Sequence, residues 1–340
     1  CRMVGVPREE ILGRTPMRFV GENDRQFLML NREQLFEGGF NQFEGTLLPR
    51  SGAPTPVLIH GNQLRDPGGE VLGSMIFLTD LTQQKRSLLL AGEVQKNLLP
   101  AEAPCNEALD MAGRTLSCDE IGGDYFDYLW HRECPEDAVS LVVGDVTGHG
   151  VEAALLMTTA RAFLRMRASQ CGDGGPILTE LNRQLARDVA DSGRFMTLCF
   201  VRFDLPRRCL RWVRAGHPPG LVYDPSADRF RELRGDGLPL GVDAHYRYEE
   251  HRYDNLQPGQ VIVIGTDGIW EASDRLGNAY GIRRFRDVIR THAKFPAEGI
   301  LDAVYADVRE FTRGARQADD ITLVVAKVRE FPGSPADFEI

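Results

Sequence analysis

Apolar and polar residues alternate in three stretches near the start of the chain: "FEGTLLPR", "TPVLIHGNQLRD" and "VLGSMIFLTDL". The segments between them, "SGAP" and "DPGGE", have the composition of tight turns. Alternation with a period of two is typical of strands that bury one face. The pattern therefore predicts an antiparallel sheet of three strands, preceded by short helical pieces.

The next segment, "QQKRSLLLAGEVQKNLLPAEAP", has apolar residues at helical spacing. Prolines at positions 100 and 104 end the predicted helix. Near-heptad spacing is found at Leu81, Leu88, Ala91 and Leu98. Two interpretations stay open: the helix pairs with its copy in a second chain, or it lies on the domain that follows.

After Pro104 the pattern changes to three strands, "DMAGRTLS", "DYFDYLW" and "AVSLVVGDV", and then to two helices, "VEAALLMTTARAFLRMRAS" and "PILTELNRQLARDVA". Four or more strands follow, among them "FMTLCFVRFD", "CLRWVRAG", "GLVYDP" and "GQVIVIGTDG". Two helical stretches between Arg283 and Arg313 precede a last strand, "DITLVVAKVRE". Strands at both ends with helix pairs between them predict an α+β sandwich.

Composition narrows the class of protein. A chain of 340 residues is long enough for two domains, and no apolar run approaches the length of a membrane span. The net charge of −9 argues against nucleic-acid partners and anionic membranes. Seven scattered cysteines without C-x-x-C spacing predict reduced thiols in a cytoplasmic protein and argue against structural zinc.

Four aspartates share one sequence context, each at a predicted strand boundary: Asp124, Asp145, Asp267 and Asp319. An unpaired charge beside a buried strand is costly, and no matching set of lysines or arginines accompanies these motifs. Hard divalent cations bind carboxylate and carbonyl oxygens. Any one motif alone is explained by an ordinary turn, but four in one domain predict a shared metal site.

Two family resemblances follow from longer motifs. "VGVPREEILGR", "GTLLPRSGAPTPV" and "GSMIFLTDLTQQK" resemble the second half of a PAS domain, whose opening strands are expected before Cys1. The resemblance implies a sensor domain over residues 1–83 and leaves its ligand unknown. We expect a connecting helix over residues 84–104 and a frayed tail over residues 331–340.

The second resemblance rests on six motifs in order: "CDEIGGDYFDYLW", "LVVGDVTGHGVEAALLM", "RAGHPPGLV", "GDGLPLGV", "VIGTDGIWEA" and "ADDITLVV". They resemble PPM-type metal-dependent protein phosphatases (protein phosphatase 2C-like), in the bacterial SpoIIE-like or RsbU-like branch. The resemblance implies a phosphatase domain over residues 105–330. It also implies a four-layer α-β-β-α sandwich of two antiparallel sheets.

The same resemblance implies a site with two Mn²⁺ or Mg²⁺ ions. Asp145 would bridge both ions, and Asp124 would bind one of them together with the main-chain oxygen of Val146. Asp267 and Asp319 would bind the other. A two-metal site activates a water for attack on phosphorus, so Asp145 and Asp124 would act in catalysis through that water. Asp320 stands where many relatives have Asn, which makes it the weaker ligand candidate.

The histidines and arginines indicate the catalytic site less clearly than the aspartates do. His149 lies two residues after Thr147. We interpret it as a residue that does not bind metal itself but forms a hydrogen bond within the turn that orients Asp145. His217 in "AGHPP" is a candidate proton donor, with a hairpin role favoured. The arginine that holds phosphate in eukaryotic relatives has no evident counterpart in this sequence.

These features together predict a protein serine/threonine phosphatase regulated by a PAS sensor. The resemblance implies that its substrate is a phosphorylated STAS-type anti-sigma factor antagonist in a partner-switching pathway, and a homodimer is expected. In the regulatory hypothesis the helix around Leu88 to Leu98 moves the helix after Gly150 and thereby Asp145.

Two alternatives remain. One is a non-catalytic signalling scaffold. The other is a nucleotide cyclase, because "GGDYF" is close to a GGDEF motif, although Tyr125 replaces its second acid.

Overall fold

The structure is a computed structural model that describes residues 1, 3–21, 24–25, 41–130, 138–168, 170, 172–190 and 192–330. The chain divides into two compact units, Cys1–Leu90 and Ala91–Ile340. The predicted tail over residues 331–340 lies outside the described residues.

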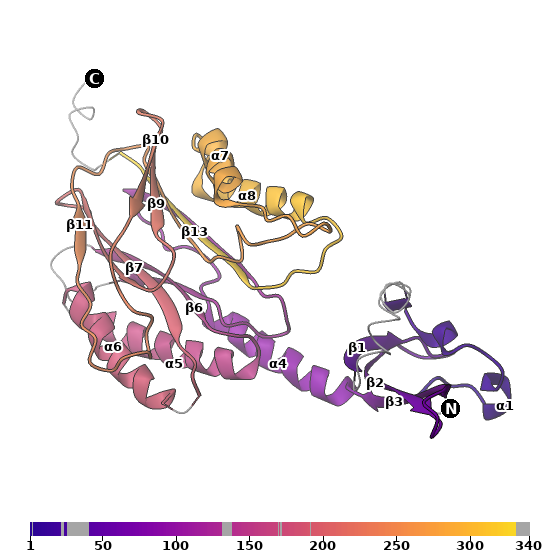
Figure 1. Ribbon diagram of the computed structural model, residues 1–340. Helices are drawn as coiled ribbons and strands as arrows, with labels where there is room; N and C mark the ends of the chain where they lie inside the picture. Colours follow the sequence, from indigo (N-terminus) through magenta and orange to yellow (C-terminus); the bar gives the residue numbers. More distant parts are fainter. Residues whose placement is uncertain are drawn as a thin grey trace. The chain divides into compact units, whose positions relative to one another are not determined.

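The smaller unit is built on a three-stranded antiparallel sheet in the order β1-β2-β3 (Figure 1). Its elements are α1 (Arg8–Ile11), η1 (Pro16–Phe19), β1 (Asn41–Leu47), β2 (Thr55–Arg65) and β3 (Val71–Asp80). Its core consists of buried Val4, Val6, Leu47, Val57 and Ile59. The sheet predicted from alternation and turn chemistry is therefore confirmed.

Helix α4 (Thr82–Leu98) follows β3 directly and ends before Pro100. Its sequence is rich in Leu, Gln and Lys, which are good helix formers. Gly92 is its buried position. A glycine inside a helix costs about 1 kcal/mol relative to alanine, so its presence indicates a close approach to another part of the chain.

The larger unit contains two five-stranded sheets (Figure 1). Within each sheet all the recorded strand pairs are antiparallel. One has the order β10-β9-β12-β13-β4, with β4 (Leu109–Leu116), β9 (Gly220–Asp224), β10 (Arg229–Leu233), β12 (Val261–Gly265) and β13 (Ile321–Val328). The other has the order β11-β8-β7-β6-β5, with β5 (Tyr125–Trp130), β6 (Val139–Val146), β7 (Met196–Asp204), β8 (Cys209–Ala215) and β11 (His251–Tyr253).

Helices cover the outer face of each sheet, which gives four layers in the order α-β-β-α (Figure 1). The pair α5 (Val151–Ala168) and α6 (Gly174–Asp188) packs on the β5–β8 sheet, and the pair α7 (Ile282–His292) and α8 (Ala297–Phe311) packs on the other. Neighbouring residues of β6 alternate accordingly: Leu141 and Val143 face the second sheet, and Val142 faces the helices. The predicted four-layer sandwich is confirmed.

The sequence pattern does not single out strands β10 (Arg229–Leu233) and β11 (His251–Tyr253). Strand β10 has the sequence RFREL, and β11 is three residues long. Both lie at sheet edges, where short and charged strands are favoured because they discourage pairing with other chains. Such strands have no extended apolar alternation for sequence reasoning to detect.

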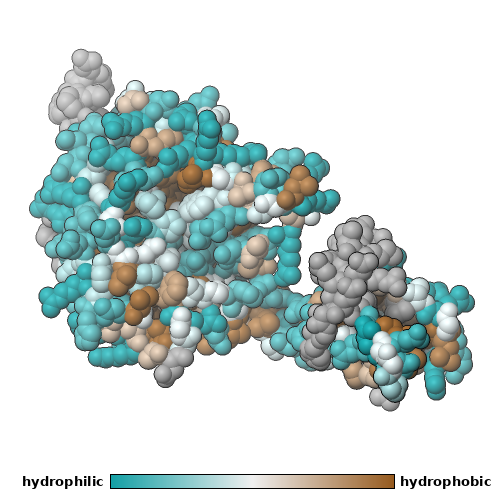
Figure 2. Space-filling model, viewed as in Figure 1, coloured by the Kyte–Doolittle hydropathy of each residue, from teal (hydrophilic) through white to brown (hydrophobic). Residues whose placement is uncertain are grey.

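The face of the larger unit seen in Figure 2 is mainly hydrophilic, with scattered apolar positions. Across the described part of the chain, none of the helices combines the length and the apolar character that crossing a bilayer requires.

Candidate metal centre

The four aspartates singled out from the sequence come from the ends of strands in both sheets. Asp145 lies near the end of β6, and Asp124 directly precedes its neighbour β5. Asp267 follows β12, and Asp319 precedes β13, which pairs with β12. Because the two sheets pack face to face, these strand ends meet at one end of the sandwich.

The charges that act on Asp145 come from carboxylates of the other sheet. Burial is the main cause that raises the pKa of Asp145 to about 7, and the charges of Asp267, Asp319 and Asp320 raise it further. A hydrogen bond with the Asp124 carboxyl partly opposes these effects. Like charges raise a carboxyl pKa only at short range, so carboxylates from both sheets lie around Asp145.

Asp124 is the most deeply buried member of the group, with 4% of its surface exposed. Burial, followed by the charge of Asp145, raises the pKa of Asp124 well above its usual value. Two hydroxyls donate hydrogen bonds to its Oδ2 atom, Thr266 Oγ1 at 3.0 Å and Thr322 Oγ1 at 2.6 Å. Thr266 directly follows β12, and Thr322 belongs to β13. The sheet that contains these two strands therefore fixes the orientation of the Asp124 carboxylate.

Asp320 has a different environment from its neighbour Asp319. The backbone N–H of Cys118 donates to its Oδ1 at 2.8 Å, and the N–H groups of Gly123 and Asp124 donate to its Oδ2 at 2.8 and 3.4 Å. Both carboxylate oxygens are thus used to hold the segment that leads into β5. Burial is the main cause that raises the pKa of Asp319, and the charges of Asp267 and Asp320 add to it.

The main-chain oxygen of Val146 lies close to the segment that carries Asp124. A Cβ atom at Gly123 would be 2.8 Å from that oxygen, and a Cβ atom at Gly122 would be 2.2 Å from Asp320 Oδ2. Both distances are shorter than side chains allow, so this tight packing requires glycine at both positions.

The donors fit a hard divalent cation in their chemistry. They are carboxylate and carbonyl oxygens, three of the carboxyls have raised pKa values, and no arginine or lysine ion pair is formed by Asp124, Asp145 or Asp267 within the described residues. Across that same part of the chain, no three His, Cys, Asp or Glu side chains are drawn together closely enough to hold one ion as they stand.

His149 contacts a residue that the sequence reasoning missed. Its Nδ1 lies 2.8 Å from Asp119 Oδ2 rather than in a bond within its own turn, and the His149 side chain is 69% exposed. The guanidinium of Arg316 lies 3.6 Å from the other Asp119 oxygen. Asp119 stands in the quoted "CDEIGGD" motif, but only its tertiary contacts distinguish it from the other acidic residues.

His217 is fully buried behind β7, where its Nδ1 lies 2.8 Å from Thr197 Oγ1. Burial, the main cause, lowers the pKa of His217 to about 3. The imidazole is therefore neutral near neutral pH and cannot supply a proton from an imidazolium.

Two further side chains bind the turns that carry the aspartates. Gln95 of α4 donates through Nε2 to Gly122 O at 2.7 Å and accepts through Oε1 from Gly122 N at 3.1 Å. Arg194 donates through Nη1 to Thr147 O at 2.7 Å. Neither residue has a local signal in the sequence, because each acts on backbone that is distant along the chain.

The tyrosine of the cyclase-like motif is a core residue. Tyr125 is fully buried, and its hydroxyl donates to Asp127 Oδ2 at 2.9 Å. Arg165 of α5 donates to the same carboxylate at 2.6 and 2.7 Å. "GGDYF" therefore forms the start of β5 and its packing against α5.

Comparisons with known families agree with this architecture. The family described as Stage II sporulation protein E (SpoIIE) matches residues 135–329, and the PAS fold matches residues 1–86. Phosphoserine phosphatase RsbU of Bacillus subtilis is 26% identical over 244 residues, which cover 72% of this chain and 70% of RsbU. Phosphoserine phosphatase RsbP of the same organism is 22% identical over 248 residues, and the match spans 58% of RsbP.

Among solved structures, the SiaA-PP2C domain of Pseudomonas aeruginosa is 27% identical with a TM-score of 0.63, covering 72% of this chain and 97% of that domain. The SpoIIE match alone extends over more than half of the chain. The protein therefore belongs to the SpoIIE family and combines a PP2C-like phosphatase domain with a PAS fold.

Proposed function

We propose that the protein is a metal-dependent protein phosphatase that hydrolyses phosphoserine or phosphothreonine. The observation that carries this proposal is the meeting of carboxylates from both sheets around Asp145, with Asp124 buried and no arginine or lysine paired with Asp124, Asp145 or Asp267 within the described residues. In this assignment Asp124, Asp145, Asp267, Asp319 and the Val146 carbonyl oxygen hold two divalent cations, Mn²⁺ or Mg²⁺. When bound, such ions activate a water and offset charge on the phosphoryl group.

The chain's other residues position those ligands. Asp320 and the Thr266 and Thr322 hydroxyls fix the orientation of Asp124 and of the segment before it. We assign His149, paired with Asp119, to the support of the turn that carries Asp145. Loss of a residue that hydrogen-bonds to a metal ligand, or otherwise holds it in place, typically lowers metal affinity or activity about 10- to 100-fold.

The test is hydrolysis of p-nitrophenyl phosphate and a phosphoserine peptide with and without Mn²⁺. We compare the intact chain, Asp145→Ala and Asp188→Ala, an exposed aspartate at the end of α6. Turnover should require Mn²⁺, fall at least about 100-fold in Asp145→Ala and stay unchanged in Asp188→Ala. Metal-independent turnover, or equal rates in both variants, would reject the proposal.

For the substrate we propose a phosphorylated STAS-type anti-sigma factor antagonist, which is what the resemblance to the RsbU-like branch implies. The names of the relatives RsbU and RsbP, both phosphoserine phosphatases, support a phosphoserine as the reacting group. A cytosolic location belongs to the same proposal, and the free state of the described cysteines supports it. The intact phosphorylated antagonist should be dephosphorylated with a higher kcat/KM than a short phosphoserine peptide. Equal values for the two would argue against this substrate.

We also propose that the PAS domain, residues 1–83, regulates the phosphatase, residues 105–330, through the connecting helix. The support is the pair of hydrogen bonds from Gln95 to Gly122, two residues before Asp124. The route expected from the sequence, from α4 to α5, has a contact of its own, because Arg161 of α5 donates through Nε to Leu98 O at 2.6 Å. The Gln95 contact adds a second route, from α4 to the segment before β5. A change in the position of α4 would act on Asp124 without first moving α5.

A homodimer is the final part of this proposal. Leu90 and Val94 of α4 lie four residues apart and are 64% and 63% exposed, so both lie on one helix face that a second copy would cover. Sedimentation velocity of the intact chain tests it: Leu90→Glu should shift the chain to monomer, whereas Glu93→Ala should not. A monomeric wild-type chain would contradict the dimer.

A further inference from the structure

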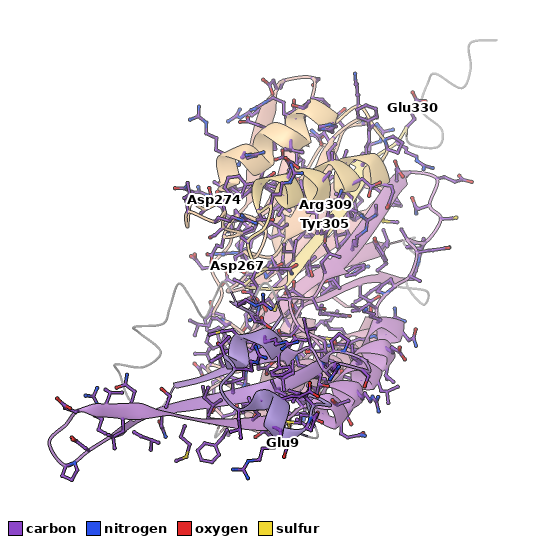
Figure 3. The ribbon with its side chains drawn as sticks, turned by 90° about the vertical axis from the view of Figure 1, so that its right-hand side faces the viewer. Glu9, Asp267, Asp274, Tyr305, Arg309 and Glu330 are labelled. Carbon is purple, nitrogen blue, oxygen red and sulfur yellow. The ribbon has the colours of Figure 1, made fainter. Side chains whose placement is uncertain are left out.

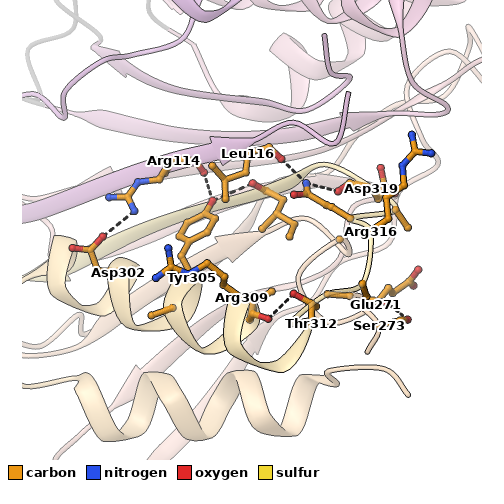
Figure 4. A pocket seen from close by; sticks show the side chains of 18 residues that line it. Arg114, Leu116, Glu271, Ser273, Asp302, Tyr305, Arg309, Thr312, Arg316 and Asp319 are labelled. Carbon is orange, nitrogen blue, oxygen red and sulfur yellow. Dashed lines mark hydrogen bonds and ion pairs between the residues drawn. The ribbon is translucent and has the colours of Figure 1, made fainter. Parts of the chain in front are cut away.

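A cavity of about 750 Å³ lies beside the metal centre, between α8, the β4–β13 edge and the loops after β12 and α8 (Figure 4). Its wall includes Asp319 and Gly268, which belong to the motifs of the centre. Figure 3 shows Asp267 on the same side of the larger unit as Tyr305 and Arg309 of α8. Cavities of about 300 to 1,000 Å³ suit ligands of drug or short-peptide size.

At one end of the cavity the charge of Arg114 is neutralised by neighbouring carboxylates. Arg114 donates to Asp302 Oδ1 at 2.8 Å and also bonds to Glu298. Its guanidinium lies 5.4 Å from the centre of the Tyr305 ring. These contacts satisfy Arg114, so this end offers little free charge to a ligand.

The other two arginines of the wall are not neutralised in this way. The side chain of Arg309, in the last turn of α8, is exposed and forms no hydrogen bond or ion pair within the described residues. Arg316 is 89% exposed, and its contact with Asp119 at 3.6 Å is longer than a charge-assisted hydrogen bond. In Figure 4, Arg316 lies next to Asp319, and Arg309 lies farther along the cavity.

The acidic groups of the wall do not balance these arginines. Asp302 is bound to Arg114, Asp319 is assigned to the metal centre, and Glu271 is the carboxylate that remains among the residues lining the cavity. The rest of the lining is largely small or apolar: Leu116, Ala272, Ala306, Val308, Ala315 and Ile321. The cavity thus combines an apolar wall with two available guanidinium groups.

The position of Arg309 at a helix C-terminus has a simpler explanation, since a cation there interacts favourably with the helix dipole. That effect does not require the side chain to line a cavity. Arg313, four residues farther along, is also cationic, is 80% exposed and pairs with Glu310, but it does not line the cavity. It therefore provides a matched control for charge at this end of α8.

We propose that this cavity is a substrate subsite that binds an acidic segment next to the phosphoserine, with Arg309 and Arg316 pairing with its carboxylates. The inference rests on the proposed phosphatase function. Arginine binds carboxylates through two parallel hydrogen bonds, and the apolar wall would contact the rest of an extended segment. Arg316, beside Asp319, would pair with the acidic residue nearer to the phosphoserine.

The experiment compares two phosphoserine peptides that differ only in having glutamates or lysines on both sides of the phosphoserine. Peptide kcat/KM is measured with Mn²⁺ for the intact chain, Arg309→Glu and Arg313→Glu. The intact chain should favour the acidic peptide, and Arg309→Glu should lower the acidic-to-basic ratio about tenfold or more, as expected for one charge-assisted contact. Arg313→Glu should keep the ratio of the intact chain.

Binding is measured separately, by fluorescence anisotropy of the labelled peptides on Asp145→Ala with and without Arg309→Glu. If p-nitrophenyl phosphate is not hydrolysed but the binding preference persists and requires Arg309, the phosphatase proposal fails and the subsite stands. If turnover is normal and Arg309→Glu changes the ratio no more than Arg313→Glu, the subsite is rejected. Circular dichroism verifies that each variant is folded.

Discussion

Asp145 and Asp320 show how two aspartates in similar sequence contexts acquire different roles. Asp145 is desolvated among like charges. Asp320 accepts three backbone N–H groups and fastens the segment before β5. Both follow or precede a β-branched run, so the local sequence treats them alike. The family resemblance implies Asp319 rather than Asp320 as a ligand, and the hydrogen bonds that occupy both oxygens of Asp320 are a physical reason for that difference.

At this scale we predict that protons compete with metal at Asp145. The raised pKa of about 7 means that the folded, metal-free protein takes up a proton as the pH falls through 7, whereas the unfolded chain does so near 3.8. The free energy of unfolding of the metal-free protein therefore contains a favourable contribution at low pH that is lost as the pH rises through about 7. Metal affinity should change in the opposite sense, falling up to about tenfold per pH unit below 7.

Calorimetric titration of Mn²⁺ into the intact chain at several pH values between about 6 and 8 measures this effect. Asp145→Asn removes the titrating group, so its residual metal binding should depend less on pH. An affinity for the intact chain that stays constant over this range would contradict the prediction.

Helix α4 contains a glycine that its helical conformation disfavours but its packing requires. Its composition favours a helix, yet Gly92 occupies the middle of it. A Cβ atom at this position would lie 2.1 Å from the carbonyl oxygen of Glu120. The glycine therefore permits the helix to lie against the segment before β5, where Gln95 bonds to Gly122.

We predict that Gly92→Ala separates helix stability from activity. Alanine should favour the helix itself by about 1 kcal/mol, but its methyl group should displace the Glu120 to Asp124 segment. Phosphatase turnover should fall about tenfold or more, as for other groups that support metal ligands. Steady-state kinetics with p-nitrophenyl phosphate measures the effect, and Glu93→Ala on the exposed side of α4 is the control. Full activity in Gly92→Ala would show that this contact does not support the site.

For the whole molecule, the division into two units predicts a local effect of metal. All the proposed ligands lie in Ala91–Ile340, and none lies in Cys1–Leu90. A ligand that binds only the folded state stabilises it by about 2.7 kcal/mol when present at 100 times its Kd. The increase in the free energy of unfolding on metal binding is therefore expected in the larger unit alone. Relief of the repulsion among its carboxylates contributes to that increase.

Differential scanning calorimetry with Mn²⁺ and with excess chelator tests this expectation. Chelation should lower the melting temperature of the larger unit's transition and leave that of the smaller unit in place. Asp145→Asn should show a reduced shift. An equal shift of both transitions, or none in the larger unit, would contradict a metal centre confined to the sandwich.

The sequence by itself determined the strands, the helix pairs and the strand-end aspartates, because periodicity and turn chemistry are local properties. It did not reveal edge strands β10 and β11, whose short or charged sequences lack that periodicity. The tertiary structure alone decided which distant groups meet: Thr322 reaches Asp124 across 198 positions, and Gln95 reaches Gly122 across 27. The same holds for Arg309, whose place in a cavity beside the centre depends on how α8 packs on its sheet. Such contacts depend on the packing of layers, and no local pattern encodes them.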